Sequence, residues 1–170
     1  FTSHVVIRGN VITDTRDGGI RLLGDDHVLI EDNLVGDDPL ASVIFGTWMT
    51  QSVKGIVVRN NRVVNGLGHW VRYYTGESGL SLDTVVAEPE KRWASSGNTY
   101  WGRASGGGFV IARHQRTVLA DDRKLSLAEI QRAGSEVASM ERDFGRDGDI
   151  DLSPRPDSFG QGSETFRRME

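Results

Sequence analysis

The sequence predicts an all-β protein, a right-handed parallel β-helix of about four coils with a C-terminal capping helix. Three observations lead to this fold class. Short apolar segments recur along the chain, an Asn recurs at the same place in each recurrence, and 21 Gly among 170 residues supply many turns. A single unit of this size cannot bury its own apolar faces, so successive units are expected to stack on one another.

The first three units are the clearest. Residues 4–12 (HVVIRGNVI) are echoed by residues 27–35 (HVLIEDNLV) and again by residues 55–63 (GIVVRNNRV), at offsets of 23 and 28. A weaker fourth copy runs from Thr84 to Tyr100 and contains a longer insertion. In each copy two β-branched strands flank one Asn, at position 10, 33, 61 or 98.

The recurring Asn is predicted to lie at a corner between two strands. Asn tolerates the left-handed backbone conformation that a tight corner needs, and stacked Asn side chains can hydrogen-bond from one coil to the next. A β-sandwich is the alternative, since its strands also come at short intervals. It does not explain why Asn and the apolar positions keep a common register over three copies.

A third strand follows each Asn by about ten residues, near Ile20, Val43, Val71 and Gly108. Strand alternation predicts which residues of this third sheet face the core. The inward residues are expected to be Ile20, Val43 and Val71, with Leu22, Phe45 and Tyr73 beside them. The outward columns are expected to be Arg21, Ile44, Arg72 and Phe109, followed by Leu23, Gly46, Tyr74 and Ile111.

The last third of the chain predicts the capping helix. Ser126 and Glu129 form a capping-box pattern, and apolar residues recur at helical spacing up to Met140, which predicts a helix over 126–142. Such a helix can cover the exposed edge of the last coil. We therefore predict one domain, with coils over 1–115 and the capping helix and tail over 116–170.

The first coil begins within a few residues of Phe1 and has no cap before it. We expect the chain to be the C-terminal part of a longer protein, with upstream coils or a partner subunit covering this edge. A small but complete β-helix is the alternative.

Composition excludes several classes of protein. Lys and Arg total 20 against 24 Asp and Glu, a net charge of -4, which argues against a nucleic-acid partner. No apolar run approaches the ~20 residues of a membrane span, so no membrane partner is expected. The chain has no Cys, which excludes disulfides, thiolate zinc sites and cysteine nucleophiles.

The segment from Asp17 to Val35 (DGGIRLLGDDHVLIEDNLV) resembles the pectin-lyase-like superfamily of right-handed β-helices. Within it, the Gly-Gly-Ile-Arg stretch and the following Gly-x-x-His-Val-x-Ile-x-x-Asn are weakly similar to the chondroitinase B and alginate lyase group. The resemblance implies an extracellular or periplasmic carbohydrate-active protein, part of a polysaccharide lyase or glycosidase acting on an acidic glycan. The Arg-His-Gly stretch of that group does not occur here. A non-catalytic glycan-binding or structural β-helix, such as an adhesin or phage fibre, therefore stays open as the alternative.

The resemblance also implies a substrate groove along the third sheet. We expect Arg21 and Trp70 to bind substrate, because guanidinium groups pair with sugar carboxylates and indole rings stack on pyranose faces. His69, Arg72 and Tyr74 are the catalytic candidates, with His or Tyr as acid or base in a β-elimination and an Arg to hold the uronate. The alternative is structural, with Arg and Tyr simply exposed and Trp70 packed beneath loop 75–84.

Acidic residues suggest two further sites. Asp14, Asp17, Asp25, Asp26, Asp37 and Asp38 recur in the turns of the first two coils. They could pair as glycosidase carboxylates, although Asp is a routine turn residue. Asp143, Asp147, Asp149 and Asp151 offer calcium-type oxygen ligands but lack the Gly and Glu of an EF-hand. No cofactor or metal is predicted, with calcium as the alternative. His4 and His27 are one coil apart and could stack.

Overall fold

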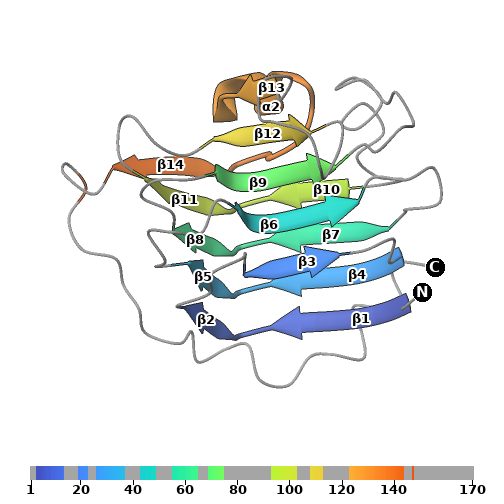
Figure 1. The fold of residues 1–170 in the computed structure, drawn as a ribbon. Helices are drawn as coiled ribbons and strands as arrows, with labels where there is room; N and C mark the ends of the chain where they lie inside the picture. The colour runs from blue at the N-terminus through green and yellow to red at the C-terminus, as the bar shows by residue number, and fades with distance from the viewer. Residues whose placement is uncertain are drawn as a thin grey trace.

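A computed structural model describes residues 3–13, 19–22, 26–36, 43–48, 55–64, 69–74, 93–102, 108–112, 123–143 and 147. In these ranges the protein is mostly β, with two all-parallel sheets and one short helix near the C-terminus. Figure 1 shows the strands stacked in layers, from β1 at one end to β12 and β13 at the other.

The strands form three sheets. Sheet A contains β1 (Ser3–Arg8), β4 (Asp26–Glu31), β7 (Ile56–Arg59) and β10 (Trp93–Ser96). Sheet B contains β2 (Val11–Thr13), β5 (Leu34–Gly36), β8 (Arg62–Val64), β11 (Thr99–Gly102) and β14 (Met140–Asp143). Sheet C contains β3 (Ile20–Leu22), β6 (Val43–Trp48), β9 (His69–Tyr74), β12 (Phe109–Ala112) and β13 (Arg123–Leu125). Sheets A and B are parallel throughout, and in sheet C only β13 runs antiparallel, to β12.

Consecutive strands visit sheets A, B and C in turn, so every third strand from β1 to β12 returns beside its predecessor (Figure 1). This is a β-helix-like arrangement, and its register follows the sequence repeat. Val5 lies opposite Val28, and Val28 lies opposite Ile56, the positions that the repeat aligns. The predicted stacking of the repeat units is thereby confirmed.

The core lies between the three sheets. Sheet A contributes Val28, Ile30, Ile56 and Val58, sheet B contributes Val35, Val63 and Tyr100, and sheet C contributes Ile20, Leu22, Val71 and Phe109. All of these side chains are buried. At about 25 cal/mol per Å² of apolar area, this burial is the main force holding the stack together.

The predicted register of sheet C is wrong at two strands. Ile20 lies opposite Phe45 rather than Val43, and Phe45 lies opposite Val71, so β6 is displaced by two residues. Phe109 lies opposite Val71 and is fully buried, whereas it was expected to face outward. The displacement of β6 by two residues preserves which face a side chain occupies, and apolar residues at 43–45 give no alternation to reveal it. β12 is displaced by one residue, which moves Phe109 from the outer face to the core.

The predicted helix over 126–142 is also wrong in length. The helix α2 covers only Leu127–Arg132, with the expected capping box between Ser126 and Glu129. Beyond Gly134 the chain changes direction and joins the stack, with Val137 bridged to Ser96 and β14 paired with β11. Val137 is 61% exposed, so the apolar spacing that suggested a longer helix does not mark a buried face. Part of the predicted tail, 116–170, thus belongs to the sheets, with β14 in sheet B and β13 in sheet C.

Candidate functional site

One register row of sheet C contains three basic residues. Arg21 of β3 lies opposite Gly46, which lies opposite Arg72 of β9. Arg72 lies opposite Val110, which lies opposite Lys124 of β13. Because each row of a sheet belongs to one face, these residues share a face that includes two exposed side chains, those of Arg21 and Lys124. We call Arg21, Arg72 and Lys124 the basic row.

The spacing along the basic row is regular. Two strand spacings separate Arg21 from Arg72, and two more separate Arg72 from Lys124, which places neighbouring Cα atoms roughly 10 Å apart. Gly46 contributes no side chain between the first two cations. Arg21 and Arg72 were predicted to share a column, and this is confirmed, although the residue between them is Gly46 rather than Ile44. Lys124 was missed, because it joins the row through the antiparallel pairing of β13 with β12, which the parallel repeat does not predict.

The three catalytic candidates all lie on β9, and their side chains lie outside the described part of the structure. His69 pairs with Val43, whereas Tyr74 pairs with Trp48 and Ala112. Five residues of extended strand separate the Cα atoms of His69 and Tyr74 by roughly 16 Å. The two residues therefore sit at opposite ends of the strand, with Arg72 between them.

Trp70 does not lie on the outer face, which corrects the prediction that it points outward to bind substrate. Its side chain is 2% exposed and belongs to the core cluster, against Tyr100 and Phe109 with ring centroids 5.3 and 6.1 Å away. Its indole Nε1 donates to the backbone oxygen of Trp101 at 2.9 Å. Trp70 is the second residue of β9, close to the corner with sheet B, and there the alternation of faces fails, since Val71 is buried too.

Replacing Trp70 with Phe tests this assignment. The variant keeps an aromatic ring in the core but loses the bond to Trp101, so the free energy of unfolding should fall by about 1–2 kcal/mol. Thermal unfolding of the variant and of the wild type checks this expectation. A variant as stable as the wild type would contradict the buried, hydrogen-bonded position of the indole ring.

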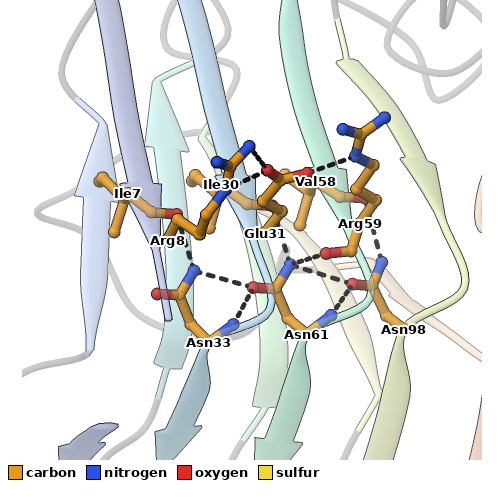
Figure 2. Close-up of polar contacts among 9 residues, drawn as sticks. All are labelled: Ile7, Arg8, Ile30, Glu31, Asn33, Val58, Arg59, Asn61 and Asn98. Carbon is orange, nitrogen blue, oxygen red and sulfur yellow. Dashed lines mark hydrogen bonds and ion pairs between the residues drawn. The ribbon is translucent and has the colours of Figure 1, made fainter. Parts of the chain in front are cut away.

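The strongest polar feature is the ladder of Asn side chains at the corner between sheets A and B (Figure 2). Oδ1 of Asn33 accepts from the backbone N and from Nδ2 of Asn10, both at 3.0 Å. Asn61 accepts in the same way from Asn33, and Asn98 from Asn61. From Asn33 onward the Nδ2 also donates to the preceding coil, at the carbonyls of Ile7, Ile30 and Val58. The predicted Asn ladder is confirmed.

The left-handed residue of each corner is the one before the ladder Asn, not the Asn itself, which corrects our reason for its recurrence. Positive φ angles occur at Gly9, Asp32, Asn60 and Gly97, each directly preceding a ladder position. Ala138 precedes Ser139, whose Oγ accepts from the backbone N of Asn98 at 3.0 Å. Asn recurs because its side chain fits the ladder, and Ser139 ends the ladder in the fifth turn of the chain.

A buried carboxylate stands at the end of the ladder. Oε1 of Glu136 accepts from Ser95 Oγ at 2.5 Å and from Tyr100 OH at 2.7 Å. Its Oε2 accepts from Ser139 Oγ at 2.7 Å and from Asn98 Nδ2 at 3.2 Å. Four donors compensate for the burial of the charge, so the contacts assign Glu136 a structural role. No sequence pattern marks it, because three of its partners, Ser95, Asn98 and Tyr100, lie 36 to 41 residues earlier in the chain.

A charged row crosses the outer face of sheet A (Figure 2). Arg8, Glu31 and Arg59 lie in register, and Glu31, only 3% exposed, accepts from Nε of both arginines, at 2.6 Å from Arg59. This row was missed, although all three residues stand two positions before a ladder Asn, and aligning the repeat units would have revealed it.

The predicted stacking of His4 on His27 is confirmed, with ring centroids 5.0 Å apart and ring planes within 3°. Most of the other acidic candidates lie outside the described part of the chain. Asp14, Asp17, Asp25, Asp37, Asp38, Asp149 and Asp151 lie outside the described residues, and Asp26 begins β4. Asp147 already accepts from the backbone N of Asp143 at 2.7 Å. Within the described ranges no group of three or more His, Asp or Glu could hold a metal ion.

Within those same ranges, no helix has the length and apolar character needed to cross a membrane. No protein-family model matches the chain, and comparison with curated proteins and with solved structures found no significant match.

Proposed function

We propose that the protein binds an acidic polysaccharide along the outer face of sheet C. The observation that carries the proposal is the basic row, with Arg21, Arg72 and Lys124 in one register at intervals of roughly 10 Å. That interval is comparable to two sugar units of an extended chain. A uronate polymer crossing the strands would therefore bring carboxylates to successive cations. Arg suits this role because its planar guanidinium holds a carboxylate through two hydrogen bonds.

The fold supports a carbohydrate ligand of this kind. We propose that the stack is a right-handed parallel β-helix of about four coils, similar to the pectin-lyase-like superfamily, in which substrates lie along one sheet. The resemblance at residues 17–35 includes Arg21 itself. By the same resemblance the protein acts outside the cytoplasm, either as part of a lyase or glycosidase or as a binding module. We favour the binding module, since Trp70 is withdrawn into the core and His69 and Tyr74 stand at opposite ends of β9.

The affinity should be modest and should fall with salt. Exposed ion pairs contribute about 1 kcal/mol or less each, and at 0.1 M salt charges more than ~10 Å apart are largely screened. Calorimetric titration with polyuronate oligosaccharides and with neutral oligosaccharides of equal length should give binding to the first only. Arg72→Gln and Lys124→Gln should each weaken binding by up to about fivefold.

Arg142→Gln is the matched control, because Arg142 is an exposed cation on β14 of sheet B. It changes the net charge equally and should leave the affinity unaltered. Equal binding of acidic and neutral oligosaccharides, or equal losses in all three variants, would overturn the proposal. Incubating the protein with polyuronate and measuring new absorbance from unsaturated ends, or new reducing ends, tests the catalytic alternative. Product that disappears in a His69→Ala or Tyr74→Phe variant would establish it.

A further inference from the structure

The end of the stack formed by β1, β2 and β3, here called the N-terminal edge, repeats the pattern found between coils. Each of these strands is the terminal strand of its sheet, so in the part of the chain that the structure describes each is paired on one side only. A strand edge of this kind is a template for another strand. Three features of the N-terminal edge specify which strand would fit.

The first feature is the direction of the Asn ladder. In every step the Oδ1 of one Asn accepts from the Asn of the preceding coil, as Asn33 does from Asn10 and Asn61 does from Asn33. Asn10 is exposed and stands first in the ladder, and no described residue donates to its Oδ1. Its Nδ2 instead donates to the carbonyl of Arg8 in its own corner, at 3.0 Å. The N-terminal edge thus presents the acceptor that another Asn would use.

The second feature is the charged row of sheet A. Arg8, Glu31 and Arg59 alternate in sign from coil to coil, and the buried Glu31 is shared between the two arginines. Two positive charges and one negative charge leave the row with a net charge of +1. The row ends at the N-terminal edge on Arg8, so a carboxylate placed beside Arg8 would continue the alternation. Opposite charges on adjacent strands stabilise a sheet, and like charges destabilise it.

The third feature is a stacked ring. The imidazole of His4 lies flat on that of His27, with centroids 5.0 Å apart, and His4 is exposed on the edge. An incoming segment would therefore lie against the imidazole of His4, the guanidinium of Arg8 and the amide oxygen of Asn10. These are the contacts that residues 27–33 make with residues 4–10 inside the stack.

We propose that the N-terminal edge binds a coil-forming segment of another polypeptide, parallel to β1 and β2, with Glu or Asp opposite Arg8 and Asn opposite Asn10. This interaction is independent of the glycan site on sheet C. The N-terminal edge of a second copy does not supply this match. It has the same acceptor oxygen and the same terminal cation, so acceptor would face acceptor and cation would face cation. Its other end carries Ser139 in the ladder and the antiparallel strand β13.

Two segments of this chain provide matched probes of ten residues. Residues 27–36 (HVLIEDNLVG) carry Glu31 and Asn33, whereas residues 55–64 (GIVVRNNRVV) carry Arg59 and Asn61 at the same positions. As synthetic peptides, both can continue the ladder, but only the first places a carboxylate beside Arg8. General electrostatic attraction favours the other peptide, because the protein has a net charge of -4. A preference for the acidic peptide therefore reports the local contact.

The experiment titrates the full chain with each peptide by fluorescence anisotropy and maps the site by amide hydrogen exchange. We expect the 27–36 peptide to bind about fivefold or more tightly than the same peptide with Glu31→Arg. With Asn33→Ala in the peptide, binding should weaken by about tenfold, because Asn10 Oδ1 loses the Nδ2 donor, one of the two donors that a ladder Asn supplies. Added exchange protection should appear in β1 and β2 and not in sheet C.

Variants of the protein complete the test. Arg8→Gln should fold, since glutamine can still donate to Glu31, and it should reduce the preference for the acidic peptide to less than about twofold. Arg142→Gln should leave the preference unchanged. Equal affinity for the Glu and Arg peptides, absence of binding, or protection confined to sheet C would overturn the proposal. Self-association of the chain that buries β1 and excludes the peptide would also overturn it, because the occupant would then be a second copy.

Discussion

Asn61→Ala should unfold the protein or bring it close to unfolding. Asn61 is fully buried at the centre of the ladder, where its Oδ1 accepts two hydrogen bonds from Asn33 and its Nδ2 donates to Ile30 and Asn98. The alanine removes these bonds from buried partners in the coils on both sides, at about 1–3 kcal/mol for each group. We expect a loss of about 4 kcal/mol or more, against the total of 5–15 kcal/mol that is typical of a domain.

Asn10→Ala is the control for this prediction. Asn10 has the same side chain in the same ladder, but it is exposed and water can replace its partners. Urea unfolding followed by circular dichroism should place the control within about 1 kcal/mol of the wild type. Equal losses for the two variants would mean that the ladder does not contribute through burial.

Gly36→Ala should be nearly as damaging, for a different reason. Gly36 has a φ of +142°, and a Cβ built on it would lie 1.9 Å from the backbone oxygen of Val64 in the adjacent strand β8. Neither a side-chain rotation nor a small shift relieves a contact with backbone, so β5 and β8 would have to separate. We expect a loss of about 3 kcal/mol or more, the upper range for an overpacked core.

Gly134→Ala separates the steric effect from the backbone effect. Gly134 also has a positive φ, +92°, but an added Cβ would meet nothing within 4 Å. It should cost about 1 kcal/mol, the penalty for alanine in that backbone region. The difference between the two midpoints of thermal unfolding measures the contact with Val64. Equal midpoints for the two variants would contradict the close approach of β5 to β8.

The stacking of the coils could be predicted because two features of the repeat, its apolar residues and its Asn, indicate the same alignment. The apolar residues and the Asn keep the same offsets, and both sets end up in register, as Val28 with Ile56 and Asn33 with Asn61. Ladder contacts join residues that are aligned by the repeat, so the alignment itself predicts them. The position of Arg21 and Arg72 on one row could be predicted for the same reason, since strand alternation survives a slip of two residues.

The remaining features depend on contacts that the repeat does not contain. Trp70 follows a segment that is not repeated, so the repeat does not predict on which face of β9 its ring lies. The structure places the ring against Tyr100. The helix ends at Arg132 because the following residues complete the ladder, through Ser139, and the buried network, through Glu136. Helical spacing cannot reveal partners so distant in sequence. Lys124 joins the basic row through an antiparallel pairing that the repeat does not predict.

The polarity of the ladder has a consequence for the time course of folding during synthesis. Each ladder Asn donates its backbone N–H to an acceptor in the coil that is made next, from Asn10 to Asn33 and finally from Asn98 to Ser139. A coil leaving the ribosome therefore cannot complete its corner until its successor has emerged. The last corner is completed by Ser139 and Glu136, in the segment that follows α2. The nascent chain should stay sensitive to proteases until that segment clears the exit tunnel, and then become resistant in one step.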